Sequence, residues 1–185
     1  MSETSSDPAG GDATTSADVL IEVPGVADGS ELWRIARDSK TLDLNSSYAY
    51  LLWCRDFART TRVARVGGVV AGFVIGYVRP DAPDTVVVWQ VAVDSAYRGA
   101  GLAARLLDGL LGGTADQGVR YLETTVTRDN VASNRTFTSL AKRWQTGFQH
   151  TELFPSEVFP DGHDAEYLYR IGPVKVTTPR GLKEK

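Results

Sequence analysis

The chain has 185 residues and a net charge of −3, with 42% hydrophobic and 23% charged residues, a composition typical of one soluble globular domain. No apolar run approaches the roughly 20 residues of a membrane-spanning helix, and the N-terminus lacks the basic and apolar segments of a secretory signal. Residues 1–18 contain acids but no Lys or Arg, so the remainder is nearly neutral and carries no basic face for nucleic acid. We therefore expect a cytoplasmic protein with neither a membrane nor a nucleic-acid partner.

Both ends of the chain are polar. Residues 1–18 consist mainly of Ser, Thr, Gly, Ala and Asp, which cannot bury enough surface to offset the entropy of ordering. We predict a disordered tail over 1–18, one domain over 19–173, and a short basic tail over 174–185. The single cysteine, Cys54, excludes an intramolecular disulfide, and we expect no metal site.

The first half of the chain alternates between strand and helix patterns. In order, it predicts a strand at 19–23, helices at 28–39 and 45–57, two strands within 61–80, and a strand at 84–94. The two strands of 61–80 meet at Gly67-Gly68, a dipeptide that supplies the positive φ of a hairpin turn. Residues 84–94 are almost continuously β-branched, as expected of a central strand covered on both faces.

The second half continues the alternation. It predicts a helix beginning at 102, a strand at 119–127, a helix at 130–144, and strands at 146–154 and 165–172. The whole order predicts an α/β (α+β) protein with a mixed, mostly antiparallel sheet and helices on both of its faces.

A turn of small residues leads into the helix at 102. Leu102, Leu106 and Leu110 form one helical stripe, which predicts a core-facing side. In the turn at 98–103, only the arginine and the leucine are large, so a ligand can approach the backbone N–H groups closely. The first N–H groups of a helix lack partners within the helix and attract anions. The turn is therefore a candidate phosphate site.

This turn meets neither the phosphate-binding loop with Lys-Ser/Thr nor the dinucleotide fingerprint with three spaced glycines. It resembles motif A of the GNAT superfamily of acetyl-CoA-dependent N-acetyltransferases, as Arg98-x-x-Gly101-x-Ala103 directly after a strand ending in Val-Ala-Val-Asp. The resemblance implies the GNAT fold, with acetyl-CoA as co-substrate. It assigns the pyrophosphate to Arg98, Gly99, Gly101 and Ala103, and the pantetheine arm to the backbone of Val91 and Val93.

Four further segments narrow the resemblance. "LDLNSSYAYLLWCRDFA", "VWQVAVD", "ETTVTRDNVASNRTF" and "FPDGHDAEYLYRI" are similar to the L-2,4-diaminobutyrate acetyltransferases of ectoine biosynthesis, and together extend from about residue 42 to residue 171. This resemblance implies transfer of acetyl to the γ-amino group of L-2,4-diaminobutyrate by a homodimer. A substrate with one carboxylate and two ammonium groups needs acids and hydrogen-bond donors in its pocket.

Three residues of the matched segments are candidates to bind this substrate from one side. Asp43 could contact an ammonium group, or it could cap the helix that follows. We expect Tyr48 and Trp89 to enclose the aliphatic part of the substrate, the alternative for Trp89 being core packing on a central strand.

Four polar residues complete the candidate substrate site. Gln90 is the only polar side chain in "VVVWQVAV", and a buried amide needs partners, either a ligand or a structural bridge. Glu123 and Thr125 share one face of the strand at 119–127. We expect Glu123 to be catalytic, holding an ammonium or accepting its proton through a water, unless it lies exposed at an edge. His163 would otherwise be taken for a surface histidine, and only the resemblance makes it a site candidate.

The start of the helix at 130–144 carries one more candidate and one departure from the family. Asn130 could contact CoA or cap the helix. Many GNAT enzymes place a tyrosine seven residues after this asparagine to protonate the departing thiolate, but Phe137 stands there and has no proton to donate.

Two other functions remain open at this point. The protein could acetylate another amine, such as a polyamine or a protein N-terminus, or it could bind acyl-CoA without turnover. A protein substrate would need an open groove, whereas the bulky loop around "FPSEVFPDGHD" suits a small, covered pocket. The missing tyrosine gives some support to a non-catalytic protein, but the joint presence of Asp43, Trp89, Glu123 and His163 speaks against it.

Overall fold

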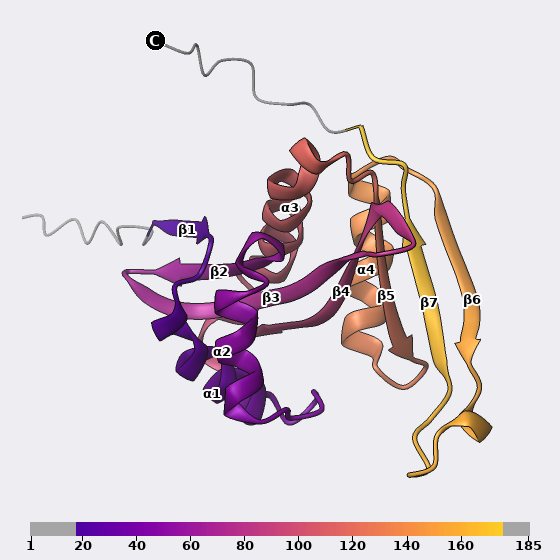
Figure 1. The fold of residues 1–185 in the computed structure, drawn as a ribbon, viewed down its shortest axis with the longest axis horizontal. Coiled ribbons are helices and arrows are strands. Elements are labelled where there is room, and N and C mark those ends of the chain that lie inside the picture. The colour runs from indigo at the N-terminus through magenta and orange to yellow at the C-terminus, as the bar shows by residue number, and fades with distance from the viewer. Residues whose placement is uncertain (1–17, 176–185) are drawn as a thin grey trace, which may run out of the picture.

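The computed structural model describes residues 18–175, which fold around one seven-stranded sheet (Figure 1). In space, the strands follow the order β1-β2-β3-β4-β5-β7-β6. Their bounds are β1 (Val19–Glu22), β2 (Thr61–Val66), β3 (Val69–Arg79), β4 (Ala82–Val93), β5 (Tyr121–Thr127), β6 (Phe148–Phe154) and β7 (Glu166–Ile171). Every neighbouring pair is antiparallel except β4 and β5. The predicted mixed, mostly antiparallel sheet is confirmed.

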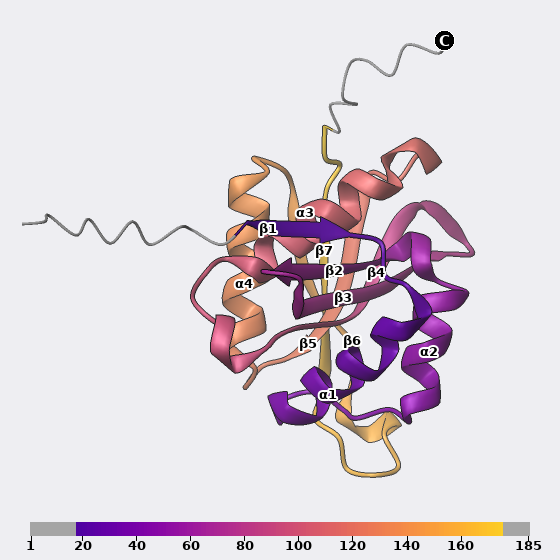
Figure 2. The ribbon, with the colours of Figure 1, turned by 90° about the vertical axis from the view of Figure 1, so that its left-hand side faces the viewer.

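Helices cover both faces of this sheet, as the sequence predicted (Figure 2). The helices α1 (Gly29–Ser39) and α2 (Ser47–Arg55) bury their apolar sides on one face. On the other face lie α3 (Leu102–Thr114), through the predicted leucine stripe, and α4 (Val131–Arg143). None of the helices within residues 18–175 is long and apolar enough to cross a membrane.

The predicted boundaries agree closely with these elements. Gly67 and Gly68, with φ of +57° and +84°, form the turn between β2 and β3. Most of the predicted tails, namely residues 1–17 and 176–185, lie outside the described residues. At the other end of the domain, Val174 is buried and its N–H donates to the carbonyl of Arg120 at 2.8 Å, so the packed body extends one residue beyond 173.

A β-bulge in β4 reverses which side chains face which layer. Ile75 of β3 is opposite Gln90 and Gly76 is opposite Val88, which leaves Trp89 as the extra residue. Because a one-residue insertion shifts the alternation, Val88 packs on the α3 side whereas Gln90 turns toward α2. The bulge therefore places an exposed tryptophan and a buried amide side by side.

The parallel strands β4 and β5 separate part of the way along. Their pairing runs only from Thr85 opposite Tyr121 to Val87 opposite Glu123. One residue further, the Thr124 hydroxyl donates to the carbonyl of Val88 at 3.2 Å, and beyond it the two strands spread apart (Figure 1). Both strands continue beyond this point, so a gap opens between them in the middle of the sheet.

Gly76 permits the bulge because a side chain there would collide with the neighbouring strand. A Cβ at Gly76 would lie 2.3 Å from the carbonyl oxygen of Val87. We predict that Gly76→Ala lowers the stability by roughly 1–3 kcal/mol, measured by chemical denaturation. Gly112→Ala is the matched control, because its Cβ would meet nothing within 4 Å and alanine favours a helix. Equal stability of the two variants would contradict this account of the bulge.

Candidate active site

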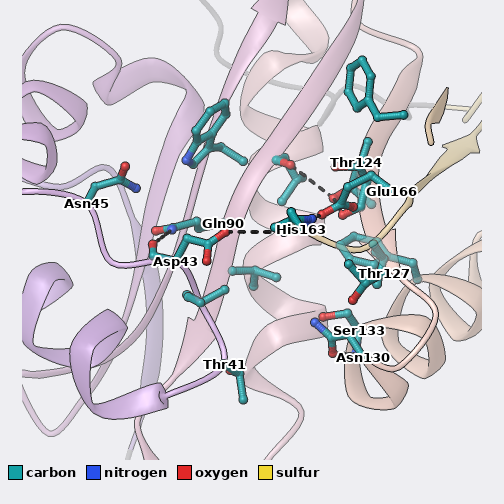
Figure 3. A pocket seen from close by; sticks show the side chains of 18 of the residues that line it. Thr41, Asp43, Asn45, Gln90, Thr124, Thr127, Asn130, Ser133, His163 and Glu166 are labelled. Carbon is teal, nitrogen blue, oxygen red and sulfur yellow. Dashed lines mark hydrogen bonds and ion pairs between the residues drawn. The ribbon is translucent and has the colours of Figure 1, made fainter. Parts of the chain in front are cut away.

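A cavity of about 510 Å³ lies where β4 and β5 separate, within the size range of small-molecule sites (Figure 3). Its walls come from β4 and β5, from the connector between α1 and α2, from the first turn of α4, and from the segment between β6 and β7. The polar lining residues are Thr41, Asp43, Asn45, Gln90, Thr124, Thr125, Thr127, Asn130, Ser133, Asp161, His163 and Glu166.

His163 lies between two carboxylates in this cavity. Its Nε2 is 3.9 Å from Oδ2 of Asp43 and 3.8 Å from Oε1 of Glu166 (Figure 3). On the other side of the ring, Nδ1 lies 2.7 Å from the carbonyl of Asp164. The hydrogen bond to Asp164 raises the pKa of His163, and the Glu166 and Asp43 carboxylates raise it further. The cluster thus joins two parts of the chain that are distant in sequence, the connector that carries Asp43 and the segment that carries His163 and Glu166.

Glu166, at the start of β7, is the acid of this cluster with the most unusual surroundings. Burial raises the pKa of its carboxyl above the ordinary value, against the opposing effects of a hydrogen bond from Thr125 and of nearby His163. Its Oε2 is buried, and no hydrogen-bond partner for it exists among residues 18–175. An acceptor left unpaired inside a protein costs stability, so this carboxyl is suited to a ligand that supplies a donor.

Glu166 is not among the site residues expected from the sequence, although it lies in the matched segment "FPDGHDAEYLYRI". The available signal was an acid at the start of a strand, three residues after a candidate histidine. In β7 Tyr167, Tyr169 and Ile171 are buried, and the face of Glu166 looked like the polar face of an edge strand. Burial of this acid comes from the loops around the cavity, which the period of the strand does not reveal.

The structure corrects the predicted catalytic role of Glu123. Its side chain is 5% exposed and does not line the cavity. Oε2 accepts from Arg79 at 2.9 Å, and Oε1 forms an ion pair with Arg170. Glu123 is the last residue of β5 that pairs with β4, so it lies before the point in the chain where the two strands separate. Both of its oxygens are engaged by guanidinium groups, so it serves as a structural ion-pair centre, whereas Thr125 on the same strand does reach the cavity.

The three residues expected to bind the substrate from one side, Asp43, Trp89 and Tyr48, differ in their positions relative to the cavity. Asp43 does not cap α2, whose N-cap residue is Ser46, and its side chain is 95% exposed. Trp89 is 55% exposed and lines the cavity, so it is not a core residue. Tyr48 is 64% exposed and is absent from the lining.

Gln90 is buried and has protein partners at both ends of its amide. Oε1 accepts from the Tyr50 hydroxyl at 3.0 Å, and Nε2 donates to the backbone carbonyl of Asp43 at 2.7 Å. Of the two interpretations left open by the sequence, the structural bridge is the one observed. Gln90 still contributes to the wall of the cavity.

The turn before α3 has the geometry of an anion site. Gly99 and Gly101 adopt φ of +83° and +70°, where a side chain would strain the backbone. The N–H groups at 102–104 make no backbone hydrogen bond within the described residues, since the first such bond of α3 runs from Arg105 to Gly101. Arg98 is exposed beside them, and Ala103 is partly exposed in the first turn. These residues fit a pyrophosphate.

Other candidate CoA contacts lie between this turn and the cavity. Val91 and Val93 follow the point where β4 leaves β5, and Val91 lines the cavity while Val93 does not. Asn130 caps α4 by accepting from the N–H of Ser133 at 3.1 Å, and it also lines the cavity. Phe137 is buried beneath the same wall. No group of three or more potential metal ligands occurs within residues 18–175.

Known proteins similar to this chain share one enzyme name. Residues 30–141 match the Acetyltransferase (GNAT) family. The chain is 61% identical to the L-2,4-diaminobutyric acid acetyltransferase of Streptomyces coelicolor over 85% of this chain and 95% of that protein. It is 60% identical to the protein of the same name from Streptomyces avermitilis, over 83% and 88% of the two chains.

A solved structure is similar over the same region. The diaminobutyrate acetyltransferase EctA from Paenibacillus lautus, in complex with its substrate L-2,4-diaminobutyric acid and coenzyme A, superimposes with a TM-score of 0.80 and is 40% identical. The match covers 85% of this chain and 96% of that one.

The environments of the two glutamates predict opposite effects on stability. A carboxyl whose pKa is raised in the folded state binds its proton more tightly there, so the free energy of unfolding falls as the pH rises through that pKa. Glu166→Gln should remove this fall and should keep or raise the unfolding temperature at neutral pH. Glu123→Gln, the matched control, should lower it, because Arg79 and Arg170 lose an anionic partner. Thermal unfolding from about pH 4 to about pH 8 measures both effects, and a less stable Glu166→Gln at neutral pH would contradict the assignment.

Proposed function

The chain belongs to the L-2,4-diaminobutyric acid acetyltransferases of the GNAT family, as its sequence segments predicted, and we propose that it acetylates the γ-amino group of L-2,4-diaminobutyrate with acetyl-CoA. The product, N4-acetyl-L-2,4-diaminobutyrate, would serve ectoine biosynthesis. The observation that carries the proposal is the unpaired oxygen Oε2 of Glu166, whose carboxyl is grouped with Asp43 and His163 where β4 and β5 separate.

The charges of this cluster complement those of the substrate. Glu166 and Asp43 supply carboxylates for its two ammonium groups, and His163, whose raised pKa favours the charged form, supplies a donor for its carboxylate. Trp89 offers an exposed aromatic surface against the short aliphatic part. Thr125 contributes a hydroxyl beside Glu166. Residues on both sides of the cavity would therefore bind the substrate.

Acetyl-CoA supplies the activated acetyl group as a thioester. We assign its pyrophosphate to the turn of Arg98, Gly99, Gly101 and Ala103, where free N–H groups, the positive end of α3 and one guanidinium meet. The backbone of Val91 and Val93 borders the gap between the strands, and Asn130 stands at its α4 side.

Amide formation needs a neutral amine, whereas a free alkylamine near pH 7 is mostly protonated. The reaction as a whole converts an ammonium and a thioester into an amide and a thiol, with release of one proton. We assign Glu166 to accept the proton of the ammonium, a role that its raised pKa suits. Phe137 cannot donate a proton to the departing sulfur. We propose instead that the hydroxyl of Ser133, one helical turn earlier in the cavity wall, donates a hydrogen bond to this sulfur.

Release of free thiol from acetyl-CoA with three amines tests the function. We expect release with L-2,4-diaminobutyrate, and roughly 10- to 100-fold lower kcat/KM with 1,3-diaminopropane, which lacks the carboxylate, and with 4-aminobutyrate, which lacks the second ammonium. Glu166→Gln should lower kcat by about 10²-fold or more. Proton NMR of the product should place the acetyl group on the γ-nitrogen.

The same assay decides between the competing functions. Faster release with a polyamine or a peptide N-terminus than with diaminobutyrate would identify another amine as the substrate. Binding of CoA without release for any amine would identify a non-catalytic acyl-CoA-binding protein.

We also propose that residues 19–173 act as one acetyltransferase domain in the cytoplasm, and that two copies associate through β6. All seven residues of β6 are exposed, including Phe148, Leu153 and Phe154. Within the described residues β6 pairs only with β7, so its outer edge offers backbone groups and apolar side chains to a second copy.

Light scattering after size exclusion tests this association. We expect a mass of two chains for the protein and of one chain for Leu153→Lys, because a charge in the interface would remain without a partner. Val69→Lys is the control, since Val69 is an exposed valine on β3 and should leave the dimer intact. A single-chain mass for the unaltered protein, or a dimeric Leu153→Lys, would refute an interface through β6.

A further inference from the structure

Three groups form a hydrogen-bonded chain from the core to the substrate side of the cavity. The Tyr50 hydroxyl donates to Gln90 Oε1 at 3.0 Å, and Gln90 Nε2 donates to the backbone carbonyl of Asp43 at 2.7 Å. The chain therefore connects α2, β4 and the connector between α1 and α2. We call it the Tyr50–Gln90–Asp43 link.

The buried end of this link is rigid. Tyr50 is fully buried in α2, and its ring meets Phe73 of β3 edge-on, with centroids 6.1 Å apart and planes at 82°. Gln90 is 5% exposed. Side chains packed on all sides keep one rotamer, so the amide is held in one orientation.

The bulge in β4 is what directs Gln90 toward Tyr50. If β4 had no bulge and Trp89 were paired regularly, the alternation of the strand would send Gln90 to the α3 side, where Val88 packs. Gly76 leaves the space that the bulge needs. An irregularity in the sheet therefore builds the link and exposes Trp89 to the cavity at the same time.

The far end of the link is the least supported part of the site. Residues 40–46 form neither helix nor strand between α1 and α2, and the Asp43 side chain is 95% exposed. Leu42 packs partly on the core, Asn45 is hydrogen-bonded to Tyr50, and the carbonyl of Asp43 is held by Gln90. The bond from Gln90 is the one that acts on Asp43 itself, so its loss should loosen the Asp43 carboxylate beside His163 most directly.

We propose that Tyr50 and Gln90 are positioning residues that fix Asp43 for the amine substrate, without touching that substrate through the amide. The inference rests on the proposed function. It predicts an effect on one substrate only, because Asp43 faces the amine whereas the acetyl-CoA contacts lie on the turn before α3 and on the far part of β4. A merely structural pair of buried polar groups would instead affect both substrates together.

Tyr50→Phe and Gln90→Met test the link while keeping the packing volume close to the original. Each variant should raise the KM for diaminobutyrate about 10-fold, the effect of losing one buried hydrogen bond, while the KM for acetyl-CoA stays within about 2-fold. Calorimetric binding of diaminobutyrate to the CoA complex should weaken to the same extent. The effects of the two changes should not add in the double variant, because both loosen the same connector, residues 40–46, which carries Asp43.

Thr114→Val is the matched control for a general loss of stability. Its hydroxyl is also buried and hydrogen-bonded, to the carbonyls of Leu110 and Leu111 in α3, remote from the cavity lining. We expect it to lower the unfolding temperature without changing either KM. Equal changes in both KM values in the Tyr50 and Gln90 variants, or no change in either, would overturn the inference. Failure of the unaltered protein to acetylate diaminobutyrate would instead overturn the proposed function.

Discussion

The parallel pairing of β4 and β5 ends after Val87 and Glu123, and the site depends on that separation. At the last paired position, Glu123 of β5 is held by Arg79 of β3 and Arg170 of β7, so the ion pairs connect three strands. Beyond this position, toward the C-terminal ends of the two strands, β4 and β5 are no longer paired, and the cavity lies between them. The buried ion pairs of Glu123 thus lie at the last paired position, immediately before the sheet opens.

The polar groups that line the gap between β4 and β5 lower the stability of the fold but can bind a ligand. Burial of Glu166 with one unpaired oxygen works against folding, and the bulge at Trp89 interrupts the ladder between β3 and β4. A substrate ammonium would supply the missing donor at Glu166, so part of the folding cost becomes binding energy. Unfavourable features of this kind are common at functional sites, and here the unpaired oxygen and the bulge lie around one cavity.

The sequence was sufficient to predict the elements, the layers and the turn before α3, because these follow from local patterns and from one family motif. The sequence could not reveal which of two acids on strands, Glu123 or Glu166, faces the cavity. Glu123 is neutralised by arginines 44 and 47 residues away in the chain, and no local pattern reveals such partners. Glu166 is buried by loops whose packing has no period. The choice between ligand contact and bridge for Gln90 depended on a bulge that a continuous β-branched run conceals.

The central claim is that Glu166, and not Glu123, faces the amine at the gap between β4 and β5. A crystal structure of the protein with CoA and L-2,4-diaminobutyrate tests it most directly. We expect the pantetheine arm between the two strands and a substrate ammonium within hydrogen-bond distance of Glu166, with Asp43 and His163 around the same molecule. A substrate bound away from Glu166, or in contact with a Glu123 released from Arg79 and Arg170, would contradict it.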